Sequence, residues 1–468
     1  MTDTVIAAGG TAAERLLVHA ALATPTAEER AELVELAHRV TDWAAFFELA
    51  QLNATVPLVR RSLIAAEVYE LLPPLVRVRF DAVTERIATA NDRRLAGAVR
   101  LLRRFDERGV RCMVLKGMLF ATEVYGDPHY KRMNDLDILL EPHQVDSAVE
   151  IYRELGLFAT SELLGKAPSV RTERSHHLPS FVSRDGALVV GTHWGLITPL
   201  APYTVDYTAI WERVRPIDFH GVPTWAMAHE DNLHHLGIHL PYYKTGVREL
   251  GDIWNLARHT GADLDYNLLA GRIAAAGSEG LMYHALALAH RLVPNPDFAR
   301  LLDRIAPRVD RFTRADTARK VSDVRTLLRS RSTHTSRIEK AYTEFNMTSD
   351  KREKLDSFGR LWAGLLLVPG DEAARMSSLR DPGALAAVGA RLIAPYRLTR
   401  VFQRDLGRWL FPAALAKTVY DLGAAYAGEL RSRTGLGGSR PEPLGLDDYA
   451  ARLGLTRADL QAVLDSQE

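Results

Sequence analysis

The chain has 468 residues, of which 47% are hydrophobic and 25% are charged, so it has the composition of a folded protein and is too long for one compact core. It carries 59 Lys and Arg against 58 Asp and Glu, and this balance excludes a bulk polycation. We therefore expect two or three domains. Nucleic-acid binding would need a local basic patch, so we expect no nucleic-acid partner.

The single cysteine, Cys112, excludes an internal disulfide and a cysteine-rich zinc module. It lies in an apolar run, which predicts a buried strand residue rather than a nucleophile. The N-terminus has no basic leader segment, and the longest apolar run, 361–369, is far shorter than the ~20 residues of a membrane helix. These features predict a cytoplasmic protein without a membrane partner.

Residues 1–104 are predicted to form a helical N-terminal domain. Thr26-Ala27-Glu28-Glu29 is typical of a capping box, and apolar residues follow at helical spacing between Leu33 and Val40. Pro73-Pro74 interrupts the pattern. A long amphipathic helix rich in arginine is expected after this break.

Residues 105–222 change to the pattern of a small α/β domain. We expect a strand, a short helix, a second strand, a second helix and a hairpin, since short apolar runs alternate with helical segments and turn residues. In chain order the expected elements are Arg111–Leu115, Met118–Tyr125, Asp135–Leu140, Pro142–Gly156, and the hairpin strands Pro179–Ser183 and Ala187–Trp194.

Residues 223–430 are predicted to be helical again, with a break at Pro294-Asn295-Pro296. Residues 431–468 are expected to form a Gly/Ser/Pro linker and a short helical tail, which is too small to argue for DNA recognition. The predicted fold class is α+β, a mostly helical chain with a central α/β domain.

The sharpest chemical signal is Asp135-Leu136-Asp137 at the start of the second strand. Alternation puts both carboxylates on one face, where they repel unless a cation neutralises them. Mg²⁺ prefers a few carboxylates together with water and substrate phosphates, so the pattern predicts a magnesium site for a nucleotide. The alternative is a solvated strand end with two surface acids.

Several short motifs, separated along the chain, occur in the same order as in a known protein family. They are Asp42-Trp43, Val114–Gly117, Tyr125–Asp127, Arg132, Asn134–Leu140, His177–Pro179, His193-Trp194, Arg248–Ile253 and Ala394–Arg397. Together they resemble an uncharacterised bacterial nucleotidyltransferase family, often found beside natural-product genes, in the superfamily that includes DNA polymerase beta. The resemblance spans roughly residues 12–401 and implies that the α/β domain is polymerase-beta-like.

The resemblance also implies roles for individual residues. Asp135 and Asp137 would be catalytic and would hold Mg²⁺ on the phosphates of an NTP, with ATP as the expected substrate. The backbone of Gly117 would approach the phosphates, because a side chain there would block them. Lys116 and Arg132 would contact phosphate.

Two positions depart from the superfamily pattern. Met118 stands where a serine commonly follows the glycine, and Gly191 stands where the resemblance implies a third carboxylate. Three interpretations follow: His193 or Asp185 replaces the missing acid, the acceptor is acidic enough to need no base, or the site binds a nucleotide without turning it over.

The helix around His235 and His239 places these two histidines four residues apart, as zinc ligands can be, but the glutamate of the metalloprotease pattern is absent between them. The favoured interpretation is that this helix packs its histidine-bearing face against the α/β domain. Asp252 on the next helix would then pair with one of these histidines.

The function expected from these features is the magnesium-dependent transfer of a nucleoside monophosphate from an NTP, with ATP as the first choice. The acceptor is a small molecule or a peptide, in the setting of natural-product biosynthesis. The alternative is a catalytically inactive nucleotide-binding or protein-interaction module with the same fold.

Overall fold

The computed structural model describes residues 10–164, 175–197, 199, 201, 203–240, 245–322, 324–330, 355–356 and 358–359. It consists of α-helices around a mixed β-sheet, which confirms the predicted α+β class. Apart from the four residues at 355–359, the predicted helices between 331 and 430, the Ala394–Arg397 motif, the linker and the tail lie outside the described residues.

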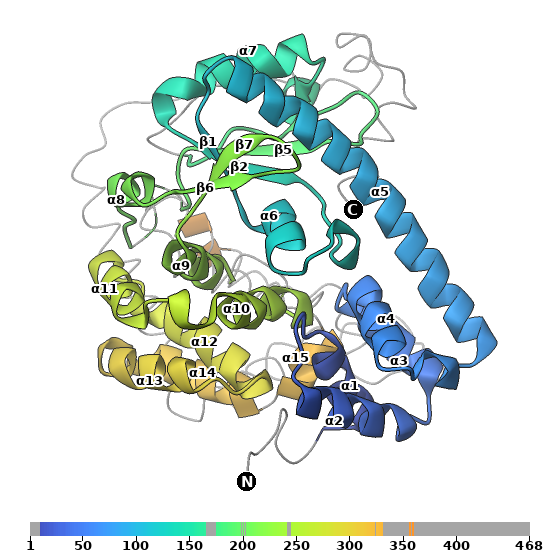
Figure 1. The fold of residues 1–468 in the computed structure, drawn as a ribbon. Coiled ribbons are helices and arrows are strands. Elements are labelled where there is room, and N and C mark those ends of the chain that lie inside the picture. The colour runs from blue at the N-terminus through green and yellow to red at the C-terminus, as the bar shows by residue number, and fades with distance from the viewer. Residues whose placement is uncertain are drawn as a thin grey trace, which may run out of the picture.

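Five helices form the N-terminal part: α1 (Ala12–Ala20), α2 (Ala27–His38), α3 (Trp43–Leu52), α4 (Val56–Ala65) and α5 (Pro74–Glu107). The capping box at Thr26 is confirmed, because its side chain and that of Glu29 each accept a hydrogen bond from the other residue's backbone N–H. Helix α5 begins at the second proline of the predicted break. It runs from the N-terminal helices along one side of the molecule and past the sheet (Figure 1).

Within the described residues the sheet has seven strands: β1 (Cys112–Val114), β2 (Leu136–Leu140), β3 (Phe158–Ala159), β4 (Phe181–Val182), β5 (Val189–His193), β6 (Arg215–Asp218) and β7 (Pro223–Ala226). Their order is β3-β4-β5-β2-β1-β7-β6. Strand β2 is antiparallel to β1 and parallel to β5, and β7 is parallel to β1. The boundary expected at residue 222 falls inside the β6–β7 hairpin, so the sheet includes a strand that the sequence assigned to the following helices.

Ten further α-helices follow in the described part of the chain. They are α6 (Lys116–Glu123), α7 (Val145–Glu154), α8 (Tyr207–Glu212), α9 (His229–His239), α10 (Val247–Thr260), α11 (Tyr266–Ala276), α12 (Glu279–Leu292), α13 (Pro296–Ile305), α14 (Arg311–Ser322) and α15 (Val324–Ser330). Figure 1 shows α6 between the sheet and α10, and α15 beside the N-terminal helices. The turn expected at Gly117 is instead the first turn of α6.

One continuous hydrophobic core joins the N-terminal helices, one face of the sheet and the helices that follow it. Leu16, Phe80, Ile138 and Trp254 all belong to this core. Cys112 is buried in it as predicted, and burial raises the pKa of its thiol to about 12. A smaller cluster covers the opposite sheet face. No helix in the described ranges is long and apolar enough to span a bilayer.

A buried ionic network links the α/β part to α10 and to the N-terminal helices. The Asp252 carboxylate accepts hydrogen bonds from Lys131 Nζ at 2.6 and 2.8 Å and from the Tyr125 hydroxyl at 2.8 Å. One turn later, Asn255 accepts a hydrogen bond from the Ala23 N–H and donates one to the Ala21 carbonyl. Asp252 therefore pairs with Lys131 and Tyr125, not with a histidine of α9 as the sequence suggested.

The segment before β2 is also fixed to α5. The Asn91 side chain donates to the carbonyls of Pro128 and Lys131 at 2.7 and 2.8 Å, and its Oδ1 accepts the Met133 N–H at 3.2 Å. Residues 128–133 are thus held by α5 on one side and by α10 on the other. The predicted acid pair begins two residues later.

We predict that Asp252→Leu destabilises the protein by about 3–5 kcal/mol, because it leaves the Lys131 ammonium buried without a counter-charge. The double variant Lys131→Met/Asp252→Leu should recover most of that loss, since no charge is then buried. Urea unfolding of the wild type and the variants measures both effects. A double variant no more stable than Asp252→Leu would contradict the ionic interpretation.

Candidate active site

The acid pair lies at the N-terminal end of β2. Asp137 is inside the strand and Asp135 directly precedes it, while Leu136 between them is fully buried in the main core. Because side chains alternate along a strand, the two carboxylates share the face opposite Leu136. The geometry is the one that the sequence predicted.

Asp137 is held by two basic side chains. Lys116 Nζ lies 3.1 Å from Oδ2, and His193 Nε2 donates to Oδ1 at 3.1 Å. Burial favours the protonated carboxyl, but Lys116 and His193 outweigh it and hold the pKa of Asp137 well below its usual range. Asp137 is therefore an anion at any physiological pH.

Asp135 has the opposite character. The charge of Asp137, together with burial, raises the pKa of Asp135 to about 7, against the opposing effects of Lys116, Arg248 and Arg94. Within the described residues Asp135 forms no hydrogen bond or ion pair. Its carboxyl is thus free to exchange a proton for a cation near neutral pH.

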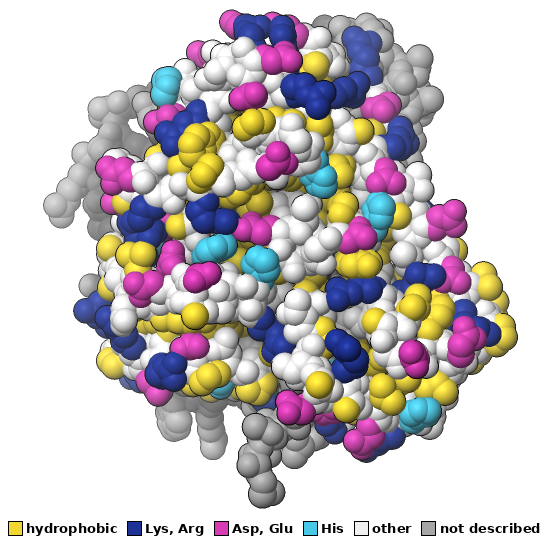
Figure 2. Space-filling model, viewed as in Figure 1, with side chains coloured by type: hydrophobic (Ala, Val, Ile, Leu, Met, Phe, Trp, Pro, Cys, Tyr) yellow, Lys and Arg dark blue, Asp and Glu magenta, His cyan; other side chains and the backbone are white. Residues whose placement is uncertain are grey.

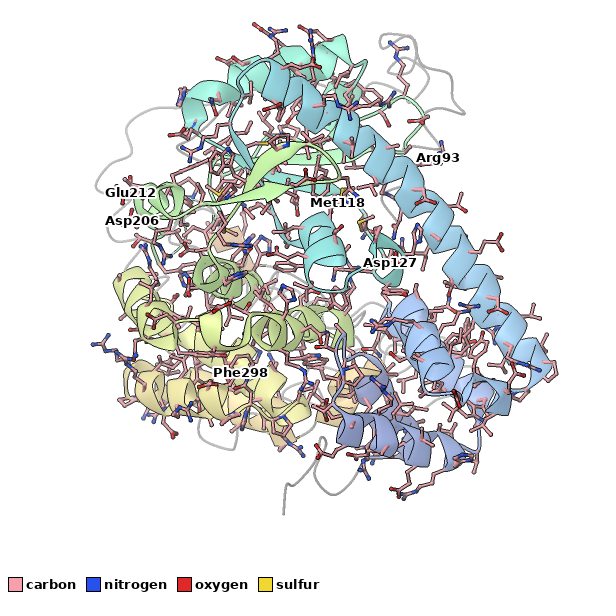
Figure 3. The ribbon with its side chains drawn as sticks, in the orientation of Figure 1. Arg93, Met118, Asp127, Asp206, Glu212 and Phe298 are labelled. Carbon is pink, nitrogen blue, oxygen red and sulfur yellow. The ribbon has the colours of Figure 1, made fainter. Side chains whose placement is uncertain are left out.

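Lys116 and Gly117 open helix α6 next to the acid pair. A Cβ built on Gly117 would meet no atom within 4 Å, so the space at this helix end is open to a ligand. Met118 follows with its side chain buried in the core, and Figure 3 places it at the end of α6 nearest the sheet. The hydroxyl that the family resemblance implies after the glycine has no counterpart at this position.

Gly191 lies directly beside Asp137, as its partner in the parallel β2–β5 register. A Cβ at this position would come within 2.3 Å of Asp137 Oδ1 and 3.3 Å of His193 Nε2. Because glycine has no side chain, the Asp137 carboxylate and the His193 ring have the space to form their hydrogen bond. Of the two replacements considered for the missing acid, only His193 reaches the pair, since Asp185 lies in the exposed hairpin turn and binds Arg93 at 3.3 Å.

Histidines surround this end of the sheet. The rings of His176 and His177 lie 5.8 and 5.5 Å from that of His193, and His235 and His239 of α9 lie 5.0 Å from each other. Burial, with a smaller effect of Lys116, holds the pKa of His235 and His239 well below the usual range. These two histidines are neutral and lie close enough to Lys116 and His193 to feel their charges. His176 was not among the site residues that the sequence predicted.

Across the described ranges, no group of three or more His, Cys, Asp or Glu side chains is arranged to hold a metal ion. His235 and His239 therefore lack the further ligands that a structural zinc needs. A cation at the acid pair would have two protein carboxylates and would take its other ligands from water and phosphate, as Mg²⁺ commonly does.

The two basic residues predicted to contact phosphate, Lys116 and Arg132, have different surroundings. Lys116 contacts Asp137, whereas Arg132 is exposed and donates to Asn134 Oδ1 at 3.1 Å, so its contact with phosphate stays a prediction. Two other arginines act on the charge of Asp135: Arg248, which the sequence marked only as part of a motif, and Arg94 of α5, which it missed. On the face shown in Figure 2, Lys and Arg are interspersed with Asp and Glu.

The family model for uncharacterised nucleotidyltransferases matches residues 39–294, which is more than half of the chain. The chain belongs to this nucleotidyltransferase family. The match includes the sheet, the acid pair, the histidines and α10, so the resemblance predicted from separated motifs is confirmed. No curated protein and no solved structure matches the chain.

We predict that Asp135→Asn stabilises the metal-free nucleotidyltransferase most at pH 8, less at pH 5, and little at or below the unfolded-state pKa of 3.8. Folded Asp135 keeps its proton up to about pH 7, whereas in the unfolded chain the proton leaves near the usual pKa of 3.8, so wild-type stability falls as the pH rises between these values. The asparagine variant escapes this loss, and the difference should reach roughly 1–4 kcal/mol. Urea unfolding in EDTA at several pH values tests it; a pH-independent difference would contradict the raised pKa.

We also predict that Gly191→Ala displaces the Asp137 carboxylate and breaks its hydrogen bond with His193. The stability should fall by about 1–3 kcal/mol, since the added methyl group has no space. Long-range ¹H–¹⁵N spectra should show a shift of the His193 ring signals. Gly117→Ala is the matched control, where a Cβ meets no neighbour and stability should change by no more than about 1 kcal/mol. Unmoved His193 signals in Gly191→Ala would refute the steric argument.

Proposed function

We propose that this protein is a magnesium-dependent nucleotidyltransferase that moves a nucleoside monophosphate from an NTP, with ATP as the first candidate, to a small-molecule or peptide acceptor. The observation that carries the proposal is the acid pair, two carboxylates on one strand face with Lys116 and the open end of α6 beside them. A cytoplasmic location would supply the NTP, and the acceptor would come from natural-product biosynthesis.

The residues at the acid pair fit a magnesium ion. Asp135 and Asp137 provide oxygen donors whose mutual repulsion a cation relieves, and hard oxygen ligands are those that Mg²⁺ prefers. Bound there, Mg²⁺ would neutralise the charge that develops on the phosphates as the acceptor oxygen attacks the α-phosphorus and pyrophosphate leaves.

The chain's own groups would position the substrates. The open backbone at Gly117 would approach the phosphates, and Lys116 and Arg132 would add positive charge to them. His193 donates from Nε2 to Asp137, which leaves the lone pair of a neutral imidazole on Nδ1. Burial lowers the pKa of His193 and favours that neutral form, so His193 would take the acceptor's proton in place of the missing carboxylate.

The second candidate is a nucleotide-binding or protein-interaction module without turnover. Gly191 favours it, because the strand position beside Asp137 offers no third carboxylate. The nucleotide-binding form of this module shares nucleotide binding with the enzyme but lacks group transfer, whereas the protein-interaction form lacks both, so the two properties are tested separately.

We predict that calorimetry detects Mg²⁺-dependent binding of a non-hydrolysable NTP analogue to the wild type. The Asp135→Asn/Asp137→Asn variant should lose at least tenfold in affinity while its far-UV circular dichroism is unchanged, because the metal ligands are gone. Titrating each of the four nucleotides selects the base. No binding to folded wild type would refute the proposed nucleotide site.

The same preparations separate the two candidates. Wild type incubated with α-³²P-labelled NTP and a low-molecular-mass bacterial extract should transfer label to an acceptor, whereas Asp137→Asn should not. Label from γ-³²P-NTP should be released in pyrophosphate and should not reach the acceptor, which distinguishes nucleotidyl from phosphoryl transfer. Binding without α-label transfer would favour the inactive module.

A further inference from the structure

Two arginines on helices outside the sheet converge on Asp135. Arg94 comes from α5 and Arg248 from α10, and both charges act on the Asp135 carboxyl although neither forms an ion pair with it. The two helices belong to the parts of the chain before and after the α/β segment. Their approach to one carboxylate therefore depends on how both helices are fixed to the segment before β2.

Helix α5 presents Arg94 through its neighbour Asn91. Residues three apart lie on the same helix face, and Asn91 is anchored to the backbone of Pro128, Lys131 and Met133. One turn further along that face, Arg94 lies toward the next part of the same segment, which contains Asp135. The interaction between the two charges agrees with this placement.

Helix α10 repeats the arrangement with a different anchor. Asp252 holds the Lys131 ammonium, and Arg248 lies four residues earlier on the same face. Arg248 thus stands one turn from the buried pair and acts on both Lys131 and Asp135. Its nearest carboxylate contact is a long one, 3.9 Å from Arg248 Nε to Glu249.

Arg94 is the less satisfied of the two guanidinium groups. Its Nε is buried and has no hydrogen-bond partner among the described residues, and Arg94 forms no ion pair there. Burial lowers its pKa, with the Asp135 charge acting in the opposite direction. Arg94 is half-buried, and a buried guanidinium nitrogen that lacks a hydrogen-bond acceptor costs stability unless an anion binds it.

We propose that Arg94 and Arg248 form a clamp for the β- and γ-phosphates of the NTP, with one arginine supplied by each flanking helix. The proposal rests on the proposed function and names the part of the substrate that these residues bind. A metal ion on Asp135 would neutralise the carboxylate charge that the two arginines now face, so their guanidinium groups would be available to another anion. A guanidinium binds phosphate through two parallel hydrogen bonds. The clamp therefore selects a triphosphate over a monophosphate.

The test is calorimetry with Mg²⁺ and three probes: inorganic pyrophosphate, the α,β-methylene analogue of the preferred NTP, and the matching NMP. Arg94→Gln and Arg248→Gln should each weaken pyrophosphate and analogue binding by roughly tenfold or more and leave NMP binding within about twofold. Arg94→Lys should restore part of the loss by returning the charge. Arg100→Gln, an exposed arginine on α5, is the matched control and should bind like wild type.

Each outcome separates the clamp from the proposed function. Loss of analogue binding in Asp135→Asn/Asp137→Asn with unchanged affinities in both arginine variants would overturn the clamp and leave the nucleotide site standing. Weakened pyrophosphate binding in the arginine variants, with Mg²⁺-dependent analogue binding retained by the double aspartate variant, would support the clamp and overturn the assigned metal site. A folded wild type that binds neither pyrophosphate nor the analogue would overturn both.

Discussion

The buried carboxylate of Asp252 is the constraint on which the geometry of the site depends. It accepts from Lys131 and Tyr125, and all three groups are removed from water, so none of the bonds can be lost cheaply. Because Lys131 lies four residues before Asp135, this ion pair fixes where the chain enters β2. Asn91 secures the same segment from α5, so two helices far apart in sequence define the position of one strand end.

This fixed entry gives the two acids unequal roles. Asp137 is committed to Lys116 and His193 and keeps its charge, so the repulsion between the acids falls on Asp135. The site as a whole offers one permanent anion and one group that exchanges a proton for a cation. In the proposed function a metal–nucleotide complex would act on Asp135, while Asp137 maintains the local arrangement of Lys116 and His193.

The sequence predicted the features that depend on local spacing and failed on those that depend on distant partners. Alternation was enough to place Asp135 and Asp137 on one face, and the Thr26 capping box follows from four adjacent residues. The partner of Lys131 is 121 positions away and carries no local signal. Similarly, Arg93 and Arg94 look alike in sequence, but helical rotation sends Arg93 to Asp185 and Arg94 toward Asp135.

Gly191 shows why a missing residue type is weak evidence for a lost function. From the sequence, glycine at this position only removes an acid. In the structure, the space it leaves is occupied by the Asp137 carboxylate and its bond to His193, so an acid there would collide with the group it is expected to assist. The departure from the superfamily pattern and the Asp137–His193 contact are therefore one feature. The proposed proton transfer therefore starts from His193 on the acid pair instead of from a third carboxylate.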